Sequence, residues 1–229
     1  MKGTNGHHKQ PQEGVTVFCG SSSGTDPDYT RAAQQLGTSL ARHSRTLVYG
    51  GGTKGLMGAT AQAALDAGGD VHGIMPTAFL PNEGSGANET SLSQGRNKHT
   101  SVNSMHERKQ LMAQSSNAFV GLPGGYGTFE EVFEAVTWTQ LGIQSKPVIL
   151  LNVKDFYTPL RYFVNSAISA GFIAECNRAF MIFVDEDKDD SEFDWGVAAL
   201  KAIKEWRDKG MGGGKAFSLE WPEDKLKLT

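Results

Sequence analysis

The chain has 229 residues, of which 38% are hydrophobic and 21% are charged, and its formal net charge is −3. A chain of this length and composition is expected to fold as one globular domain with a substantial core. It has no basic stretch of the kind that a nucleic-acid surface needs, so we expect no DNA or RNA partner. No apolar run approaches the ~20 residues of a membrane span, so we expect no membrane partner either.

The two ends of the chain differ from its middle in composition. Residues 1–13 are polar and lack the apolar core of a signal peptide, which predicts a disordered N-terminal tail. Residues 14–210 are predicted to form a single domain, and the glycine-rich, then charged residues 211–229 a loose C-terminal tail. The only two cysteines, Cys19 and Cys176, do not make a disulfide framework, which favours a reducing, cytoplasmic setting.

Strand-like and helix-like segments alternate along most of the chain. The expected strands are residues 15–19, 46–49, 71–75, 118–122, 147–151 and 179–184. The expected helices are one that starts at Pro27 after an Asp26 N-cap, and residues 56–67, 104–115, 128–141, 156–170 and 195–209. Residues 81–102, which are rich in Gly, Asn and Ser, are expected to be a long functional or mobile loop. This alternation predicts an α/β, Rossmann-like, doubly wound fold with a mostly parallel sheet and helices on both faces.

Three glycine clusters directly follow expected strands, and they begin at Gly20, Gly50 and Gly124. In such sheets, ligands bind beyond the carboxyl ends of the strands. The third cluster, PGGYGTFEE at 123–131, is a turn that runs into a helix, so its backbone N–H groups can bind an anion with help from the helix dipole. Its two carboxylates, Glu130 and Glu131, indicate a nucleotide site with a catalytic acid, although acids in a first helical turn also simply complement the dipole.

Two adjacent cations, Arg108 and Lys109, occur early in an expected helix. An arginine can bind a phosphate or ribose through two N–H groups and fix a catalytic carboxylate, whereas the alternative is a solvated helix face. The Gly50 cluster does not match the GxxxxGK[ST] pattern, and no GxGxxG follows the first strand, so kinases and dehydrogenases are disfavoured. His106 has no second ligand at metal spacing, so we expect no metal.

Together, four motifs resemble those of the LONELY GUY (LOG) family: CGSSSG at 19–24, YGGGTKGLMG at 49–58, MHERK at 105–109 and PGGYGTFEE at 123–131. Enzymes of that family are cytokinin riboside 5′-monophosphate phosphoribohydrolases, and an older label for them is lysine decarboxylase-like. The resemblance covers roughly residues 14–210. It implies hydrolysis of the N-glycosidic bond of a nucleoside monophosphate without a cofactor, and a homodimer.

The resemblance also implies roles for particular residues. Arg108 and Glu131 would be the catalytic pair. The expected substrate-binding residues are Gly20, Ser21, Gly51, Gly52, Glu83, Met105, Lys109, Gly124, Gly125, Tyr126, Gly127, Thr128 and Glu130. Glu83 matches a family glutamate in the loop after the third strand, but the segment 84–100 is longer and more polar than is usual there. The aromatic-rich helices around Trp138 and 156–163 are candidates for the dimer contact.

Three other functions compete with the one that the resemblance implies. A general AMP or purine nucleotide nucleosidase would use the same chemistry with a different base pocket. A nucleotide-binding sensor without turnover would need no carboxylate in the site. Lysine decarboxylation normally requires pyridoxal phosphate, and no lysine here lies in a recognisable cofactor-anchoring context, so we reject it.

Overall fold

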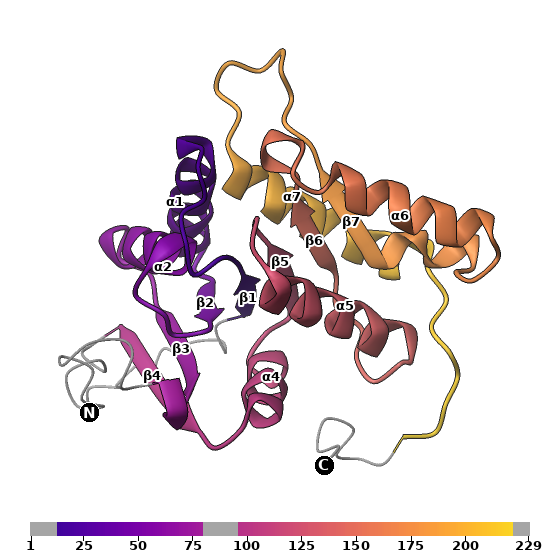
Figure 1. The fold of residues 1–229 in the computed structure, drawn as a ribbon, viewed down its shortest axis with the longest axis horizontal. Helices are drawn as coiled ribbons and strands as arrows, with labels where there is room; N and C mark the ends of the chain where they lie inside the picture. The colour runs from indigo at the N-terminus through magenta and orange to yellow at the C-terminus, as the bar shows by residue number, and fades with distance from the viewer. Residues whose placement is uncertain (1–12, 80–95, 222–229) are drawn as a thin grey trace, which may run out of the picture.

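The computed structural model describes residues 13–79 and 96–221, and residues 1–12, 80–95 and 222–229 lie outside the described part. Seven strands form one sheet in the order β4-β3-β2-β1-β5-β6-β7 (Figure 1). Each neighbouring pair is parallel. The strands are β1 (Gly14–Phe18), β2 (Thr46–Tyr49), β3 (Val71–Pro76), β4 (Asn97–Val102), β5 (Ala118–Gly121), β6 (Val148–Leu151) and β7 (Met181–Val184). This confirms the predicted doubly wound α/β fold.

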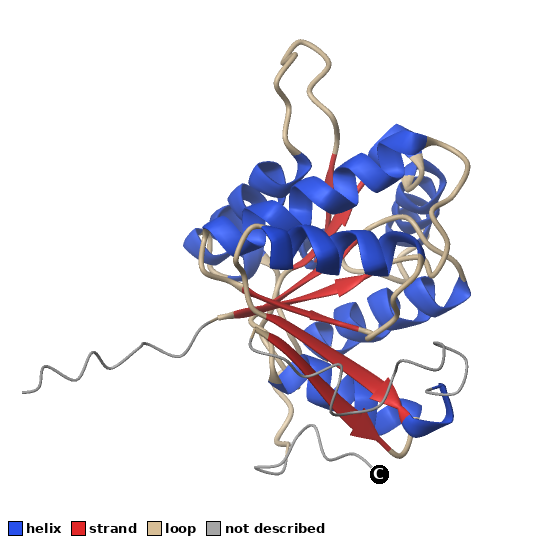
Figure 2. Cartoon of the chain, turned by 90° about the vertical axis from the view of Figure 1, so that its left-hand side faces the viewer, coloured by secondary structure: helices blue, strands red, loops and turns tan. Residues whose placement is uncertain are grey.

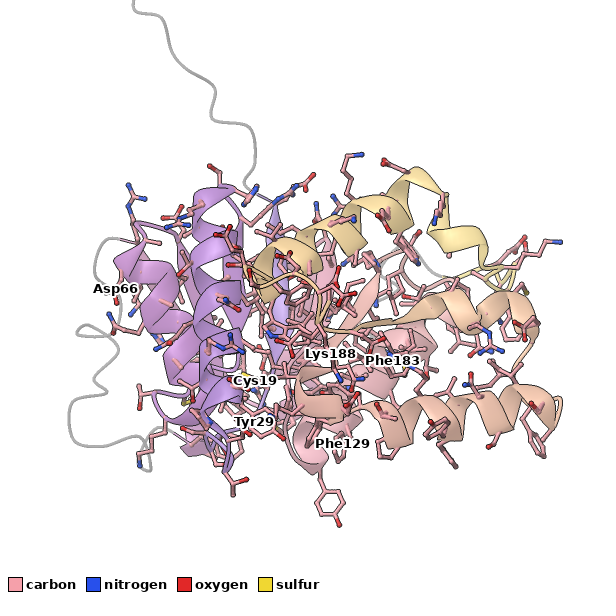
Figure 3. The ribbon with its side chains drawn as sticks, turned by 90° about the horizontal axis from the view of Figure 1, so that it is seen from above. Cys19, Tyr29, Asp66, Phe129, Phe183 and Lys188 are labelled. Atoms are coloured by element: carbon pink, nitrogen blue, oxygen red, sulfur yellow. The ribbon has the colours of Figure 1, made fainter. Side chains whose placement is uncertain are left out.

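Helices cover both faces of the sheet (Figure 2). The main helices are α1 (Pro27–Arg42), α2 (Gly55–Asp66), α4 (Met105–Gln114), α5 (Tyr126–Gln140), α6 (Thr158–Ser169) and α7 (Trp195–Asp208). Side chains alternate between the two faces along a strand, so β1 sends Val15 and Val17 to the core shared with α1, α2 and α7. Phe18 joins the core that is shared with α4, α5 and α6. In the view from above, α6 and α7 accordingly lie on opposite sides of the molecule (Figure 3).

Local sequence signals set the starts of two helices. Asp26 caps α1 by accepting a hydrogen bond from the Asp28 N–H at 2.9 Å, with Pro27 at the first helical position, as predicted. Ser104 caps α4 by accepting from the Glu107 N–H at 3.0 Å, and the Glu107 carboxylate accepts from the Asn103 N–H at 2.7 Å. This reciprocal cap fixes the first turn of α4, which the MHERK motif occupies.

The prediction of a long loop over residues 81–102 is wrong for the last six of these residues. Asn97–Val102 forms β4, which pairs with β3 at the edge of the sheet. Of its six residues only Val102 is buried, because an edge strand has a single neighbour and little of it is covered. A polar edge strand of this kind has almost no apolar alternation, so the pattern that predicts strands fails there. The remainder of the expected loop, residues 80–95, lies outside the described residues.

The chain after α7 returns to the domain in the described residues 210–221. The Lys215 N–H donates to the Asn177 side-chain oxygen at 3.3 Å, and the Phe217 N–H donates to the Gln140 carbonyl at 2.8 Å. The Trp221 indole donates to the Leu141 carbonyl at 2.8 Å. The domain boundaries that we expected from the sequence stay a prediction. None of the helices in the described ranges is long and apolar enough to cross a membrane.

Candidate active site

The glycine turns after β1, β2 and β5 meet at the carboxyl end of the sheet. The strands β1 and β5 are neighbours, and the order of strands reverses between them, which makes this the switch point where doubly wound sheets bind ligands. The Gly20 N–H donates to the Pro123 carbonyl at 3.0 Å, and the Leu56 N–H donates to the Gly20 carbonyl at 3.1 Å. Three segments far apart in the sequence are therefore held together by backbone hydrogen bonds.

The turn after β5 has no room for a side chain at Gly124. A Cβ atom there would lie 2.2 Å from the Thr128 hydroxyl oxygen and 2.9 Å from the Gly20 nitrogen. This close approach keeps the turn against the start of α5, whose N-cap is Gly125. The first N–H groups of a helix have no acceptor within the helix, so they are available to an anion at this point.

A cavity of about 300 Å³ lies in front of these turns. Ten of the residues predicted for the site line it: Gly20, Ser21, Met105, Arg108, Gly125, Tyr126, Gly127, Thr128, Glu130 and Glu131. Four predicted residues do not line it, namely Gly51, Gly52, Lys109 and Gly124. Gly124 instead shapes the turn through its close approach to Thr128 and Gly20. Glu83 is outside the described residues.

Arg108 and Glu131 form a buried ion pair in the wall of this cavity. Arg108 Nη1 lies 3.4 Å from Glu131 Oε1, and the two side chains are only 11% and 9% exposed. Arg108 Nε also donates to the carbonyl of Ile74 in β3 at 3.2 Å, and Nη1 lies 3.7 Å from the Met105 sulfur. The guanidinium is therefore held from three directions and faces the carboxylate that α5 supplies.

Comparisons with known proteins identify the family of this chain. A family model described as "Possible lysine decarboxylase" matches residues 57–191. The probable cytokinin riboside 5′-monophosphate phosphoribohydrolase LOGL9 of Oryza sativa subsp. japonica is 46% identical over 177 residues, which cover 77% of this chain and 75% of the relative. The cytokinin riboside 5′-monophosphate phosphoribohydrolase LOG2 of Arabidopsis thaliana is 45% identical, over 73% of this chain and 76% of the relative. This chain belongs to the LOG family.

Solved structures that resemble this LOG-family chain support the fold alone. The molybdenum cofactor carrier protein from Chlamydomonas reinhardtii superimposes with a TM-score of 0.59 at 23% identity, over 86% of this chain and 99% of the carrier. The molybdenum cofactor binding protein from Rippkaea orientalis gives a TM-score of 0.58 at 22% identity, over 84% of this chain and 96% of that protein. At such identities the likeness shows the fold and carries no conclusion about a ligand.

The environment of Glu131 raises its pKa from 4.5 to about 7. Burial is the largest cause, because it disfavours the charged carboxylate. Arg108 and Lys109 lower this pKa, while Glu130 and Glu134 raise it. Burial outweighs the attraction of Arg108, so this carboxyl group of the LOG-family site exchanges its proton near neutral pH. Such a group in a cavity is a candidate for proton-transfer chemistry.

Helix α5 begins at Tyr126, so the expected start at Thr128 is wrong by two residues. The turn residues Tyr126 and Gly127 already have helical conformation, because the glycine turn ends at the Gly125 N-cap. As a result, Glu130 and Glu131 lie in the second turn and the first turn contains no acid. The effect of the helix dipole falls off beyond the first turn, so it does not account for the buried carboxylate.

Lys109 connects α4 with α5 beside the cavity. Its ammonium group forms ion pairs with the carboxylates of Glu130 and Glu134, the second at 2.7 Å, and its side chain is 13% exposed. Burial lowers the pKa of Lys109, but the hydrogen bonds that its ammonium group donates to both carboxylates outweigh burial and raise the pKa above its usual value. The expected contact between Lys109 and a nucleotide stays a prediction. In this structure the residue braces the helix that supplies Glu131.

The cavity also has an apolar wall whose residues were not among the predicted site residues. The lining residues that sequence reasoning missed are Val17, Phe18, Cys19, Gly50, Met57 and Met112. Met112 follows Met105 by seven residues on α4, a spacing that places both on one face of a helix. That spacing was the available signal for Met112. Met57 belongs to the motif at 49–58, and it reaches the cavity because the β2 turn folds against the β1 turn.

Replacing Gly50 by alanine is expected to displace Arg108. A Cβ atom at this position would lie 2.0 Å from Arg108 Nη2, so the guanidinium must move away from its contacts with Ile74 and Glu131. We expect kcat of Gly50→Ala to fall by at least about tenfold, because displacing a catalytic group by about 1 Å can cost up to about 100-fold in rate. In an Arg108→Ala background the same substitution should have no further effect, and additive losses in a double-mutant cycle would refute the proposed link.

Proposed function

We propose that this chain hydrolyses the N-glycosidic bond of cytokinin riboside 5′-monophosphates, which releases the free cytokinin base and ribose 5-phosphate. The observation that carries the proposal is the buried Arg108–Glu131 pair, which shares one cavity with the glycine turn and the start of α5. One side of the cavity suits a phosphate, and the other places a carboxylate where the ribose of the same molecule would lie.

In the proposed mechanism, the 5′-phosphate binds the N–H groups of residues 125–128 and the Thr128 hydroxyl. Cleavage of the bond between C1′ and the base nitrogen gives the ribose oxocarbenium character. Glu131, as a carboxylate, stabilises this positive charge and orients and deprotonates the attacking water. The water oxygen bonds to C1′, the bonding electrons leave with the base, and the base takes up one proton. Arg108 holds Glu131 and the ribose in position.

The apolar wall favours a nucleotide whose base carries an apolar substituent over plain AMP. Met57, Met105 and Met112 line the cavity together with Phe18. Methionine side chains are unbranched and polarizable, so they adapt to an irregular apolar group. This wall is the reason to rank a cytokinin nucleotide above a general AMP or purine nucleotide substrate. The sensor without turnover ranks last, because a pure binding site gains nothing from a buried carboxylate near a phosphate.

The proposal is tested by incubating the purified protein with isopentenyladenosine 5′-monophosphate and, separately, with AMP, and by following the release of free base by chromatography. Glu131→Gln is the control. We expect release by the wild type alone and a faster rate with the isopentenyl nucleotide. Equal or faster cleavage of AMP would favour the nucleosidase alternative, and no release from either nucleotide would favour the sensor.

The phosphate is expected to contribute strongly to catalysis. Isopentenyladenosine without the phosphate should be cleaved with a kcat/KM at least about 100-fold lower, because binding of a remote group is used to stabilise the transition state. Thr128→Val should bring the kcat/KM values of the nucleoside and its monophosphate closer together. Thr128→Ser keeps the hydroxyl group and should leave the difference between them unchanged. Equal rates on the nucleoside and its monophosphate would refute the proposed role of the glycine turn in phosphate binding.

We also propose that the chain forms a homodimer through the outer faces of α5 and α6. Tyr162 and Phe163 on α6 are each 67% exposed, Phe172 just after α6 is 86% exposed and Phe133 on α5 is 39% exposed, and exposed apolar patches mark interfaces. Trp138 and Phe156, the other aromatic candidates, pack against the core. The substitution Phe163→Glu should convert a dimer into a monomer in light scattering coupled to gel filtration. Phe217→Glu, an exposed phenylalanine on the C-terminal segment, is the control, and a monomeric wild type would contradict the proposal.

A cytoplasmic location completes the proposal. Both cysteines are free thiols, Cys19 buried and Cys176 exposed, which is the state that a reducing compartment maintains. Fractionation of cells that express the tagged chain tests this, and recovery in a secreted or membrane fraction would contradict it.

A further inference from the structure

A second and larger cavity lies at the opposite end of the sheet from the candidate active site. Its volume is about 620 Å³, within the range of small-molecule sites. It lies beside the C-terminal end of α1 and along α7, two helices that pack on the same face of the sheet. It is lined by Val15, His43, Arg45, Val197, Leu200, Lys201, Ile203, Lys204, Arg207 and Asp208. None of these residues lines the cavity that contains Arg108 and Glu131.

Two arginines in this second cavity share a single carboxylate. Arg45 and Arg207 both pair with the same oxygen of Glu13, Arg207 at 3.1 Å. Burial lowers the pKa of Arg45, and the nearby charge of Arg207 lowers it further, so the two guanidinium groups repel each other. One carboxylate neutralises only one of the two charges. One positive charge of the Arg45–Arg207 pair therefore remains without a neutralising carboxylate at the wall of the cavity.

The other charged residues of the cavity do not supply that negative charge. Lys204 pairs with Asp208, and Lys201 lies 4.0 Å from Glu205 on the neighbouring turn of α7. Each lysine thus has one carboxylate of its own, and no acid is left over for the arginines among these residues. The cavity as a whole carries a net positive charge, which favours an anion.

The remaining lining residues form an apolar surface beside the arginines. Val15 and Ile203 are buried in the core, Leu200 packs against it, and Val197 is 53% exposed at the start of α7. A ligand that fills this space would cover the exposed parts of Val197 and Leu200 and lie against Val15 and Ile203, which favours a ligand with an apolar body. The two halves of the cavity thus specify two parts of one molecule.

We infer that this cavity binds a small organic anion with an apolar body, whose carboxylate sits at the Arg45–Arg207 pair and whose body covers Val15, Val197, Leu200 and Ile203. A carboxylate can accept N–H donors from both guanidinium groups and supply the missing negative charge. The N-terminal segment of the chain, residues 1–12, is a poor occupant, since it contains two lysines and no acidic residue. This site is independent of the proposed phosphoribohydrolase activity.

The inference is tested by calorimetric titration of the full chain with decanoate, below its micelle concentration, and with 1-decanol as the neutral analogue. We expect one decanoate per chain, no displacement by AMP, and binding at least about tenfold weaker for decanol, because the anion makes charge-assisted hydrogen bonds. Val197→Glu, which adds a negative charge to the cavity, should weaken decanoate binding about tenfold, whereas Val197→Gln should change it less than about threefold. Base release from the nucleotide should be unchanged in both variants.

Arg207→Gln gives a second and independent measurement, because it removes one of the two guanidinium groups. We expect it to weaken decanoate but not decanol. Equal affinities for decanoate and decanol, displacement of decanoate by AMP, equal effects of the two Val197 variants, or no binding at all would each overturn the inference.

Discussion

Glu131→Gln is expected to lower kcat by at least about 10³-fold, because glutamine can neither carry the negative charge that stabilises an oxocarbenium ion nor accept a proton from water. The loss should be seen in kcat and in kcat/KM alike, which is the sign of an interaction made only in the transition state. Glutamine has nearly the same shape and can still accept a hydrogen bond from Arg108. The variant is therefore expected to remain folded and to bind the nucleotide.

The same substitution is expected to stabilise the fold above neutral pH. The pKa of Glu131 is about 7 in the folded chain, against 4.5 as its ordinary value. Below pH 4.5 the carboxyl group is protonated in both states and costs nothing. As the pH rises from 4.5 to 7, the unfolded chain loses this proton first, so the folded state loses up to about 3 kcal/mol of stability, and the loss is complete above pH 7. Glutamine does not ionise and avoids this loss.

Urea unfolding of wild type and Glu131→Gln at pH 5 and pH 8 measures the effect. We expect the stability of the variant relative to wild type to increase by roughly 2–3 kcal/mol between the two pH values. Comparing two pH values cancels any constant effect of the changed contact with Arg108. Glu205→Gln, on the exposed surface of α7, is the matched control. If the stability difference between Glu131→Gln and wild type is the same at pH 5 and pH 8, burial does not raise the pKa of Glu131.

The sequence predicted most of the fold because most of its elements have strong local signals. The apolar run at 148–151 is buried on both faces, and the Asp26–Pro27 start of α1 is specified by adjacent residues. The strand β4 was missed for the opposite reason. Its residues are polar, and its position is fixed only by pairing with β3. The start of α5 was misjudged because a glycine turn and a helix N-terminus have similar compositions.

The sequence predicted the residues of the site better than their chemistry. The resemblance to the LOG family indicated Arg108 and Glu131, and the structure brings them within 3.4 Å. The raised pKa of Glu131 could not be read from the sequence, because burial depends on how three turns and two helices pack together. The pairing of Lys109 with two glutamates of α5 likewise depends on the contact between α4 and α5. Their catalytic and binding roles stay predictions until activity is measured.

Arg108→Lys is the second substitution with a large expected effect, although it preserves the charge. The guanidinium uses Nε to bond the Ile74 carbonyl and Nη1 to meet Glu131, with these two groups on different sides of one planar head. A lysine ammonium is a single nitrogen on a flexible chain and cannot make both contacts in this geometry. Glu131 would lose its orientation. We expect kcat to fall by about 100-fold or more, since displacing a catalytic group by about 1 Å can cost about 100-fold in rate.

Kinetic measurements on four proteins test whether Arg108 acts through Glu131: the wild type, Arg108→Lys, Glu131→Gln and the double variant. If the two residues act as one unit, the double variant should be no slower than Glu131→Gln, because the effects of residues that act together are not additive. Arg42→Lys, at the end of α1 and outside the cavity, controls for the substitution itself and should change kcat less than about twofold. Full activity of Arg108→Lys would mean that charge alone suffices, and fully additive losses would mean that Arg108 acts on the substrate without acting through Glu131.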